Sequence, residues 1–421
     1  MKLNKLVIIV VAALTSLGAS AIVNEKILTS AEVAGNNLLA YPVSGFPELT
    51  PAPEVYTPVH IEHYGRHGSR WLIAETDYTA PVVFLESVDN AGALTDTGKE
   101  LLAKVKSIAA DAAGNSGRLT STGARQHQGI ARRMYHNFPE IFADSAVIDA
   151  KSTVVVRCLL SMVNELTQFA ALAPEATIYA ESGWPLQPTL NPCDFATDAQ
   201  AKRNAADPAI QAFRRKVVHP QRFIASIMDT TKVAVNQDQQ LQLFHEIFEI
   251  AFNEQSHGRP ILASYFTPEE IDSQWQVNNA RWYVHSGYSP LSDGEMPEVT
   301  RPLLEAIIVS ADSALMTGGP EATLRFGHES VLLPLVCAMQ INGKDVVVDS
   351  LEDVASVWKA YEVFPMGGNL QLIYYTADAR EPLVKILLNE KEAKLPIDQF
   401  SPGFYRWKDV KNLWSSPAHA K

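Results

Sequence analysis

The sequence predicts an α/β fold, in which a mostly parallel sheet flanked by helices carries an inserted α-helical cap. Strand-like apolar segments alternate with helical periodicity towards both ends of the chain, as in sheets built from strand–helix units. Residues 195–257, in contrast, show helical patterns only. The 421 residues are 47% hydrophobic and 19% charged, which is an ordinary globular composition. We therefore expect a sheet-based core, a helical insert and a site between the two.

Residues 1–21 have the pattern of a cleavable signal peptide. Lys2 and Lys5 precede a short apolar run, and the small residues at 19–21 (ASA) supply a cleavage site. Because the run is shorter than the ~20 residues that span a membrane, we expect cleavage and a periplasmic or secreted protein, with no later membrane contact. The proline-punctuated segment 22–58 predicts a mostly extended lead-in.

Strand and helix signals then alternate. Residues 59–64 (VHIEHY) alternate in polarity and run into Gly65, which predicts a short strand that ends at a glycine-rich turn. Helical periods follow at 95–112 and 120–138, and both segments open with Leu-Thr-x-x-Gly. The end of a strand is where α/β proteins place ligands, so the turn at Gly65 is the first candidate for a site.

The remaining core segments repeat this pattern. Residues 152–173 begin with a β-branched run (STVVV) and continue as a helix, which predicts a strand-to-helix junction at Arg157. Residues 325–340 predict a turn and a helix, and residues 369–377 and 382–390 predict closing strands.

The domain boundaries follow from these patterns. We predict an α/β core formed by residues 22–175 and 290–421, and a mainly helical cap formed by residues 176–289. One helix of the cap carries an amphipathic stripe, which predicts core packing rather than a cofactor site. The stripe consists of Leu241, Phe244, Phe248, Ala251 and Phe252.

Charge and cysteine content limit the functional classes. The formal net charge of −12 argues against nucleic-acid binding, which usually needs a basic face. A local arginine cluster would still bind an anionic substrate, because distant acids are screened beyond roughly 8–10 Å. Cys158, Cys193 and Cys337 allow one disulfide at most, and buried thiols are an equal alternative.

The densest chemical signal is Arg66-His67-Gly68-Ser69-Arg70, at the end of the first predicted strand. Arginine binds phosphate as a planar fork, glycine permits close backbone approach, and an imidazole between two arginines is placed to attack phosphorus. Taken alone, these five residues are more typical of a solvated loop.

Neighbouring histidines raise a metal site as a second hypothesis. His60, His63 and His67 are spaced as one face of a helix requires. Because the segment predicts a strand, residues i and i+3 point to opposite sides, so we expect no metal and assign His63 to the strand.

Four motifs in order resemble the histidine acid phosphatases, specifically the multiple inositol polyphosphate phosphatase group. They are RHGSR at 66–70, LTSTGARQHQ at 119–128, STVVVRCLLS at 152–161 and FGHES at 326–330. The segments FPMGGNLQLIYY and LLNEKEAKLPI resemble the group's C-terminal strands. The likeness covers roughly residues 55–175 and 320–400, and it implies a phosphoglycerate-mutase-like core.

The resemblance also implies a role for each site residue. His67 would be the nucleophile, and Glu329 would protonate the leaving alcohol and then activate water. The transferred phosphoryl group would be held by Arg66, Arg70, Arg157 and His328. Neither a metal nor an organic cofactor is implied, since arginines supply the positive charge.

Two positions depart from the group's pattern. The group usually has His-Ala-Glu, whereas here Glu329 follows His328 directly, which rotates the acid by about 100° if a helix begins there. The usual proline or tyrosine after the second arginine is replaced by Trp71, which would line the pocket or belong to the core. The reach of Glu329 and the order of products are therefore open.

The implied function is a secreted or periplasmic phosphomonoesterase that hydrolyses myo-inositol hexakisphosphate and other inositol polyphosphates through a phosphohistidine. We expect a monomer, and a mildly acidic pH optimum unless burial raises the pKa of Glu329. An acid phosphatase of the same mechanism on sugar phosphates is the alternative, and a non-catalytic inositol-phosphate-binding protein is less favoured. Basic residues of the cap would suit a polyphosphorylated substrate, or form an ordinary solvated face: Lys202, Arg203, Arg214, Arg215, Lys216, His219 and Arg222.

Overall fold

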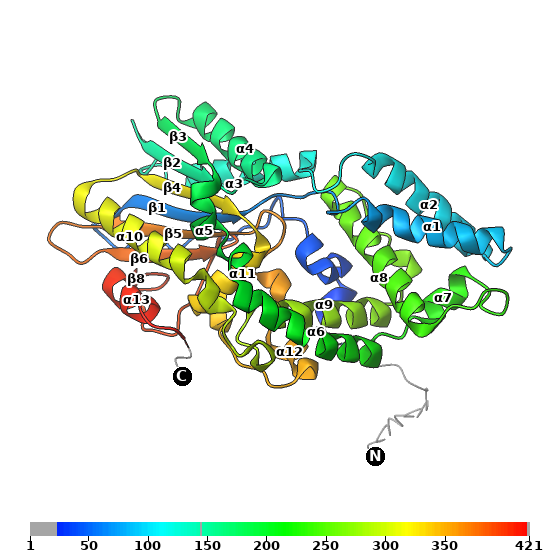
Figure 1. The fold of residues 1–421 in the computed structure, drawn as a ribbon. Helices are drawn as coiled ribbons and strands as arrows, with labels where there is room; N and C mark the ends of the chain where they lie inside the picture. Colours follow the sequence, from blue (N-terminus) through cyan, green and yellow to red (C-terminus); the bar gives the residue numbers. More distant parts are fainter. Residues whose placement is uncertain (1–22, 144, 419–421) are drawn as a thin grey trace, which may run out of the picture.

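The computed structural model describes residues 23–143 and 145–418, whose arrangement is shown in Figure 1. A sheet with helices on both faces forms one side of the molecule, and a group of helices forms the other. The predicted signal peptide, residues 1–21, lies outside the described residues. Within the described part of the chain, no helix has both the length and the apolar character that a membrane span requires.

The sheet is mixed and largely parallel. In order across it, the strands are β3 (Thr177–Ser182), β2 (Val147–Ser152), β4 (Ala322–Gly327), β1 (Thr57–Arg66), β5 (Asn369–Thr376), β6 (Leu383–Leu388) and β7 (Lys391–Glu392), with β8 (Tyr405–Arg406) also paired to β6. The first four run parallel, and β5 runs antiparallel between β1 and β6. The carboxyl ends of β2, β4 and β1 therefore lie side by side, where α/β proteins place ligands.

Helices cover both faces of this sheet (Figure 1). One face packs on α3 (Ser121–Asn137) and α4 (Val156–Leu172), and the other on α10 (Arg301–Thr317), α11 (Glu329–Ala338), α13 (Trp407–Trp414) and the one-turn α5 (Gln187–Leu190). On β1, Ile61 belongs to the first of these cores and Tyr64 to the second. Successive side chains of a strand alternate between faces, so a strand covered on both sides is apolar on both.

The remaining helices share a separate hydrophobic core. They are α1 (Thr76–Asn90), α2 (Asp96–Ala112), α6 (Thr197–Val217), α7 (Gln221–Ile227), α8 (Gln237–Asn253), α9 (Pro268–Ser286) and α12 (Leu351–Val357). The predicted stripe on α8 is buried in this core, which confirms its packing role. Helices α1 and α2 also pack here, so the helical part uses chain from before the predicted insert as well.

Some boundaries differ from the sequence prediction. The lead-in is not extended throughout: it contains 3-10 helices at Glu25–Leu28 and Ala31–Leu38, where Val33 and Leu38 pack into the helical core. Strand β3 lies at the start of the range 176–289, so this range begins in the sheet.

The β-branched run STVVV is not a strand throughout. Strand β2 ends at Ser152, and α4 begins at Val156 with a side chain that is 65% exposed. Thr153 still donates its backbone N–H to Phe326 of β4, after which the chain turns away. Valine has high strand propensity, but among the described residues no strand pairs with residues 154–156.

Candidate active site

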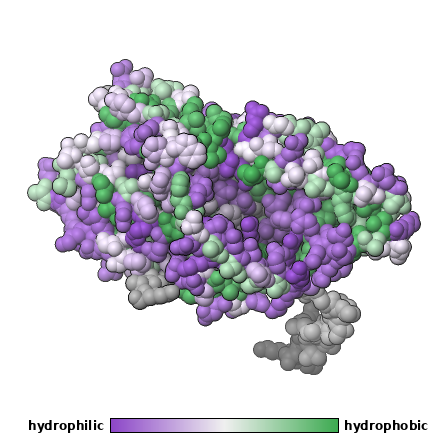
Figure 2. All heavy atoms as spheres, in the orientation of Figure 1, coloured by the Kyte–Doolittle hydropathy of each residue, from purple (hydrophilic) through white to green (hydrophobic). Residues whose placement is uncertain are grey.

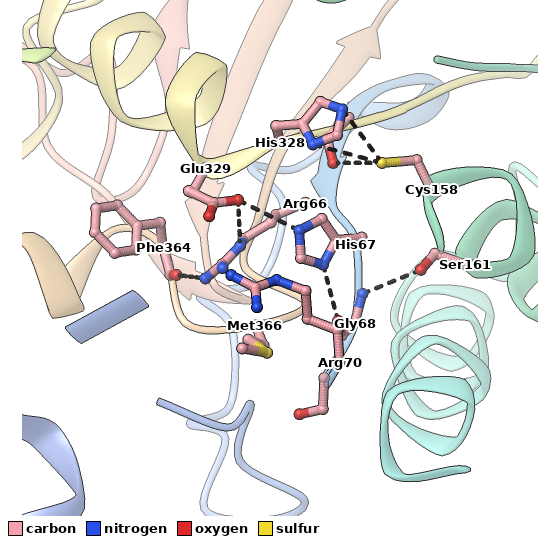
Figure 3. Close-up of polar contacts among 12 residues, drawn as sticks. Arg66, His67, Gly68, Arg70, Cys158, Ser161, His328, Glu329, Phe364 and Met366 are labelled. Carbon is pink, nitrogen blue, oxygen red and sulfur yellow. Dashed lines mark hydrogen bonds and ion pairs between the residues drawn. The ribbon is translucent and has the colours of Figure 1, made fainter. Parts of the chain in front are cut away.

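Loops after three neighbouring strands bring the predicted site residues together, and Figure 3 shows most of them. The strand ends are level, because Ser152 of β2 pairs with Phe326 of β4, and Gly327 of β4 pairs with Arg66 of β1. These ends carry all the predicted residues: Arg66, His67 and Arg70 at β1, His328 and Glu329 after β4, and Arg157 after β2. Segments far apart in sequence therefore meet at one edge of the sheet.

The loop after β1 is fixed by close backbone packing against α3. A Cβ on Gly68 would lie 2.5 Å from the carbonyl oxygen of Gly123, so this position accepts no side chain. Gln126 accepts a hydrogen bond from the backbone N–H of Ser69 at 2.8 Å and donates one to its hydroxyl at 2.9 Å. The backbone N–H of Gly68 donates to the Ser161 hydroxyl of α4 at 3.0 Å. Two helices thus hold the loop that carries His67.

His67 presents a lone pair to the site. Its Nδ1 lies 2.9 Å from the carbonyl oxygen of Gly68, which can only accept, so Nδ1 carries a proton and, in the neutral imidazole, Nε2 holds the lone pair. Burial lowers the pKa of His67 well below its ordinary value, an effect that Glu329 opposes and that Arg66 and Arg157 reinforce. A neutral imidazole with a free Nε2 is the form that acts as a nucleophile.

Glu329 is the first residue of α11 and faces His67 directly. Its Oε2 lies 3.3 Å from Nε2 of His67 and accepts a hydrogen bond from Nε of Arg66 at 3.0 Å (Figure 3). Burial alone would raise the pKa of Glu329, but Arg66, His67 and Arg70 outweigh it and hold the pKa well below the ordinary value. The direct His-Glu sequence therefore brings the carboxyl within reach of the imidazole, as a carboxylate.

Three guanidinium groups surround this pair with unused N–H donors. Arg66 is fully buried and donates from Nη1 to the carbonyl oxygen of Phe364 at 2.6 Å, and its Nη2 has no acceptor among the described residues. The buried Nε atoms of Arg70 and Arg157 likewise have no acceptor there. Burial lowers the pKa of Arg66 only to about 10, so it stays charged at neutral pH. Such donors fit a bound oxyanion, because buried polar groups otherwise find partners.

His328 caps the N-terminus of α11 beside His67, with ring centroids 5.8 Å apart. Its backbone N–H donates to the Tyr64 hydroxyl at 3.3 Å. A Cβ on Gly327 would lie 2.0 Å from that same hydroxyl, which explains the glycine before His328. Burial lowers the pKa of His328 to about 4, and Arg157 adds to this effect while Glu329 opposes it.

All three cysteines are buried free thiols, so no disulfide forms among Cys158, Cys193 and Cys337. Cys158 lies next to the site, with Sγ 3.6 Å from Nε2 of His328. Burial raises its pKa to about 12, so it stays a thiol.

One group of possible metal ligands occurs among the described residues. Ligand atoms of His67, His328 and Glu329 lie within 4.8 Å of one another. The guanidinium groups of Arg66 and Arg70 act on the same carboxylate. These fixed positive charges oppose a cation and favour an anion, so the donor set fits a phosphate group better than a metal.

Three residues close to the motif in sequence lie elsewhere or at the edge of the site. His60 bonds to Glu62 at 2.9 Å, and His63 packs on Phe326, with ring centroids 5.3 Å apart. Trp71 is half-buried, with its ring 4.0 Å from the ring of His257.

The basic residues predicted over the site are mostly paired within the protein, which agrees with the solvated-face alternative. Lys202 pairs with Asp293 and Glu295, Arg215 with Asp238, Lys216 with Glu352 and Arg222 with Glu270, while Arg203 and Arg214 donate to backbone carbonyls of His285 and Leu241. His219 is exposed.

Sequence reasoning gave no role to three residues that shape the site. Gln126 and Ser161 hold the loop of His67, and Phe364 accepts from Arg66. Gln126 and Ser161 lie inside the recognised motifs, which indicated that they are near the site. Their hydrogen-bond partners could not be predicted, because these depend on how α3 and α4 pack.

Comparisons with known proteins agree with this geometry. The family model of the histidine phosphatase superfamily (branch 2) matches residues 66–389, more than half of the chain. Multiple inositol polyphosphate phosphatase 1 of Drosophila melanogaster is 23% identical over 158 residues, 37% of this chain but only 32% of that protein's length.

Solved structures extend the likeness of the fold to most of the chain. The apo multiple inositol polyphosphate phosphatase of Bifidobacterium longum has a TM-score of 0.75 at 18% identity, covering 90% of this chain and 96% of that one. The phytase from D. castellii has a TM-score of 0.70 at 16% identity, covering 92% and 86%. The chain therefore belongs to the histidine phosphatase superfamily, branch 2.

Proposed function

We propose that the protein hydrolyses myo-inositol hexakisphosphate and other inositol polyphosphates through a phosphohistidine intermediate. The observation that carries the proposal is the setting of His67. Its Nδ1 is fixed by Gly68, its Nε2 faces the Glu329 carboxyl group at 3.3 Å, and unused guanidinium N–H groups surround it. Binding alone would give no reason for a neutral nucleophile beside a carboxyl group.

The proposed reaction has two steps, formation and hydrolysis of the phosphohistidine. In the first, the Nε2 lone pair of His67 attacks phosphorus, the bond to the inositol oxygen breaks, and the protonated carboxyl of Glu329 gives its proton to that oxygen. In the second, the Glu329 carboxylate takes a proton from water, the water oxygen attacks phosphorus, and the N–P bond breaks. Phosphate leaves, and His67 is again neutral. The arginines hold the equatorial oxygens throughout.

The first step needs a protonated Glu329, whereas the ligand-free enzyme holds a carboxylate. A bound phosphate group brings negative charge to Arg66 and Arg70, the groups that hold the pKa of Glu329 down. Binding therefore raises that pKa, and the required proton becomes available at mildly acidic pH.

The inositol polyphosphate substrate rests on the relatives. The Drosophila protein is named for these substrates, and the Bifidobacterium longum enzyme was also solved with inositol hexasulfate, at 17% identity. The internal pairing of Lys202, Arg215, Lys216 and Arg222 favours the second candidate, a phosphatase of the same mechanism acting on sugar phosphates.

Three experiments test the proposal. Rapid quenching with labelled substrate should trap an acid-labile phosphoenzyme, and failure to trap any would favour direct attack by water. Phosphate release should be faster from myo-inositol hexakisphosphate than from glucose 1-phosphate, and the reverse order would favour the sugar phosphatase. Calorimetric binding without any product would instead indicate a non-catalytic binding protein.

We further propose that the protein is exported to the periplasm or secreted, and that it acts as a monomer. The signal-like pattern of residues 1–21 supports export. N-terminal sequencing of the mature protein should begin near Ile22, and light scattering should give the mass of one chain.

A further inference from the structure

Helix α9 is buried almost all round, apart from one short stripe. Beyond its first two residues, only Asn278, Arg281, Trp282 and His285 reach solvent. They are spaced i, i+3, i+4 and i+7, which places them on one face of the helix. Figure 2 shows a hollow lined mainly by hydrophilic residues in the middle of the molecule, between the sheet and the helical part. A central helix that opens on one polar face can contribute that face to a cleft.

The arginines around His67, namely Arg66, Arg70 and Arg157, form what we call the phosphate clamp. The exposed stripe of α9 is connected to this clamp by an aromatic contact. The ring centroids of Trp282 and Phe364 are 4.9 Å apart. Phe364 accepts the hydrogen bond from Arg66, and its ring lies 5.7 Å from the guanidinium carbon of Arg66. Phe364 therefore links Trp282 of α9 to Arg66, so this face of the helix borders the phosphate site.

Glu249 of α8 provides a second link between the clamp and α9. Arg70 of the phosphate site and Arg281 of α9 both act to lower the pKa of its carboxyl group, and Asn278 forms a hydrogen bond with it. Burial raises the pKa of Glu249 to about 7, with Asp77 adding to the effect and the two arginines opposing it. At the acidic pH that the reaction favours, Glu249 is therefore mainly neutral and does not repel a phosphate.

Arg281 is the unused cation of this stripe. Its side chain is exposed and forms no ion pair or hydrogen bond within the described residues. It contributes to the lowered pKa values of His245 and His285, so it is close to both. Most of the basic cap residues considered earlier have partners within the protein, whereas Arg281 is available to bind a ligand.

We propose that Arg281 binds a second, non-reacting phosphate group of a polyphosphorylated substrate, beside Asn278 and Trp282. This assignment rests on the proposed function and adds to it the residue that distinguishes polyphosphates from simple monoesters. Because the phosphate group bound by Arg281 does not react, this contact changes the affinity for the substrate rather than the rate of the chemical step. A guanidinium–phosphate contact of this kind is worth roughly 10- to 100-fold in affinity.

The test measures binding separately from turnover. Inositol hexasulfate and inorganic sulfate are compared as competitive inhibitors of p-nitrophenyl phosphate hydrolysis by the wild type, R281A, R281Q and R281K. We expect Ki for the hexasulfate to rise roughly 10- to 100-fold in R281A and R281Q and less in R281K, with Ki for sulfate and kcat for p-nitrophenyl phosphate unchanged. The control is R380A, an exposed arginine in the β5–β6 connection at the opposite end of the sheet.

The outcomes separate this inference from the proposed function. An unchanged Ki for the hexasulfate in R281A and R281Q overturns the role of Arg281, as does a wild type that binds hexasulfate no better than sulfate. Loss of p-nitrophenyl phosphate turnover in both variants also overturns it, because Arg281 would then act on the chemistry or the fold. Failure of the wild type to release phosphate from myo-inositol hexakisphosphate refutes the proposed function, while the inhibitor constants still decide the role of Arg281.

Discussion

Two histidine–glutamate pairs lie near the loop at residues 66–70, and their surroundings are opposite. In the first, Nε2 of His67 and Oε2 of Glu329 are 3.3 Å apart, and the glutamate side chain is 12% exposed. In the second, Nδ1 of His127 and Oε1 of Glu165 are 2.7 Å apart, and both side chains are fully buried between α3 and α4.

The difference indicates that pairing with a glutamate is not enough for the role proposed for His67. His127 follows Gln126 on α3, and Glu165 lies one turn after Ser161 on α4. The pair of His127 and Glu165, which we call the sealed pair, therefore connects the two helices that hold the loop of His67. The pair of His67 and Glu329, which we call the open pair, differs in having solvent access and unused arginine donors, both of which a bound phosphate group needs.

The largest effect should come from removing the nucleophile of the open pair. We expect H67A to lower kcat/KM for p-nitrophenyl phosphate at least about 10³-fold, because no other group would form the N–P bond. Steady-state kinetics measures the loss, and circular dichroism confirms that the fold persists. Turnover close to the wild type would show that His67 is not the nucleophile.

Replacing Glu329, the proposed proton donor of the same pair, should have a smaller effect that depends on the substrate. We expect E329Q to lower kcat about 10²-fold for an inositol phosphate, since the amide cannot protonate the leaving alcohol. The loss should be smaller for formation of the phosphoenzyme from p-nitrophenyl phosphate, whose leaving group needs no proton. S330A, at the next position, serves as the control. Equal losses for both substrates would contradict a role in protonation.

The open pair could be predicted from sequence, whereas the sealed pair's function could not. His67 and Glu329 occur in recognisable motifs, and adjacent parallel strands bring the motifs together at one sheet edge. What links His127 to Glu165 is the packing of α3 on α4, which depends on tertiary contacts that no local pattern encodes.

The same holds for the fold: elements with a clear local pattern could be predicted, whereas features that depend on tertiary packing could not. Strands with a clear alternation or a continuous apolar run, such as β1, β5 and β6, were predicted close to their observed positions. The run STVVV misled because β-branched residues favour strands only where a surface exists to cover, and here Val156 remains exposed. Arg281 was missed because the exposed face of α9 can be recognised only once it is known which of its residues the neighbouring elements bury.

Breaking the sealed pair should therefore cost stability before it costs chemistry. We expect H127A to lower the free energy of unfolding by about 3 kcal/mol, because Glu165 is left as an unpaired buried acid. Loss of kcat should stay below about 10-fold, through looser positioning of the loop. Urea denaturation and steady-state kinetics measure the two effects, with the exposed H136A of α3 as the control. A loss of kcat as large as that of H67A, without loss of stability, would mean that the sealed pair takes part in the chemistry.

The smallest effect concerns how the arginines tune the open pair. His67 must be neutral to attack, and its pKa is lowered well below the ordinary value, while that of His328 is lowered to about 4. As pH falls through a lowered pKa the imidazole takes up a proton and the lone pair is lost. We therefore expect kcat/KM for p-nitrophenyl phosphate to show no decline near the ordinary histidine pKa and to fall only at clearly lower pH. Arg157 contributes to both shifts, so R157Q should move this decline to higher pH, by less than about one unit. A decline already at the ordinary pKa in the wild type, or a shift to lower pH in R157Q, would show that burial and the arginines do not keep His67 neutral.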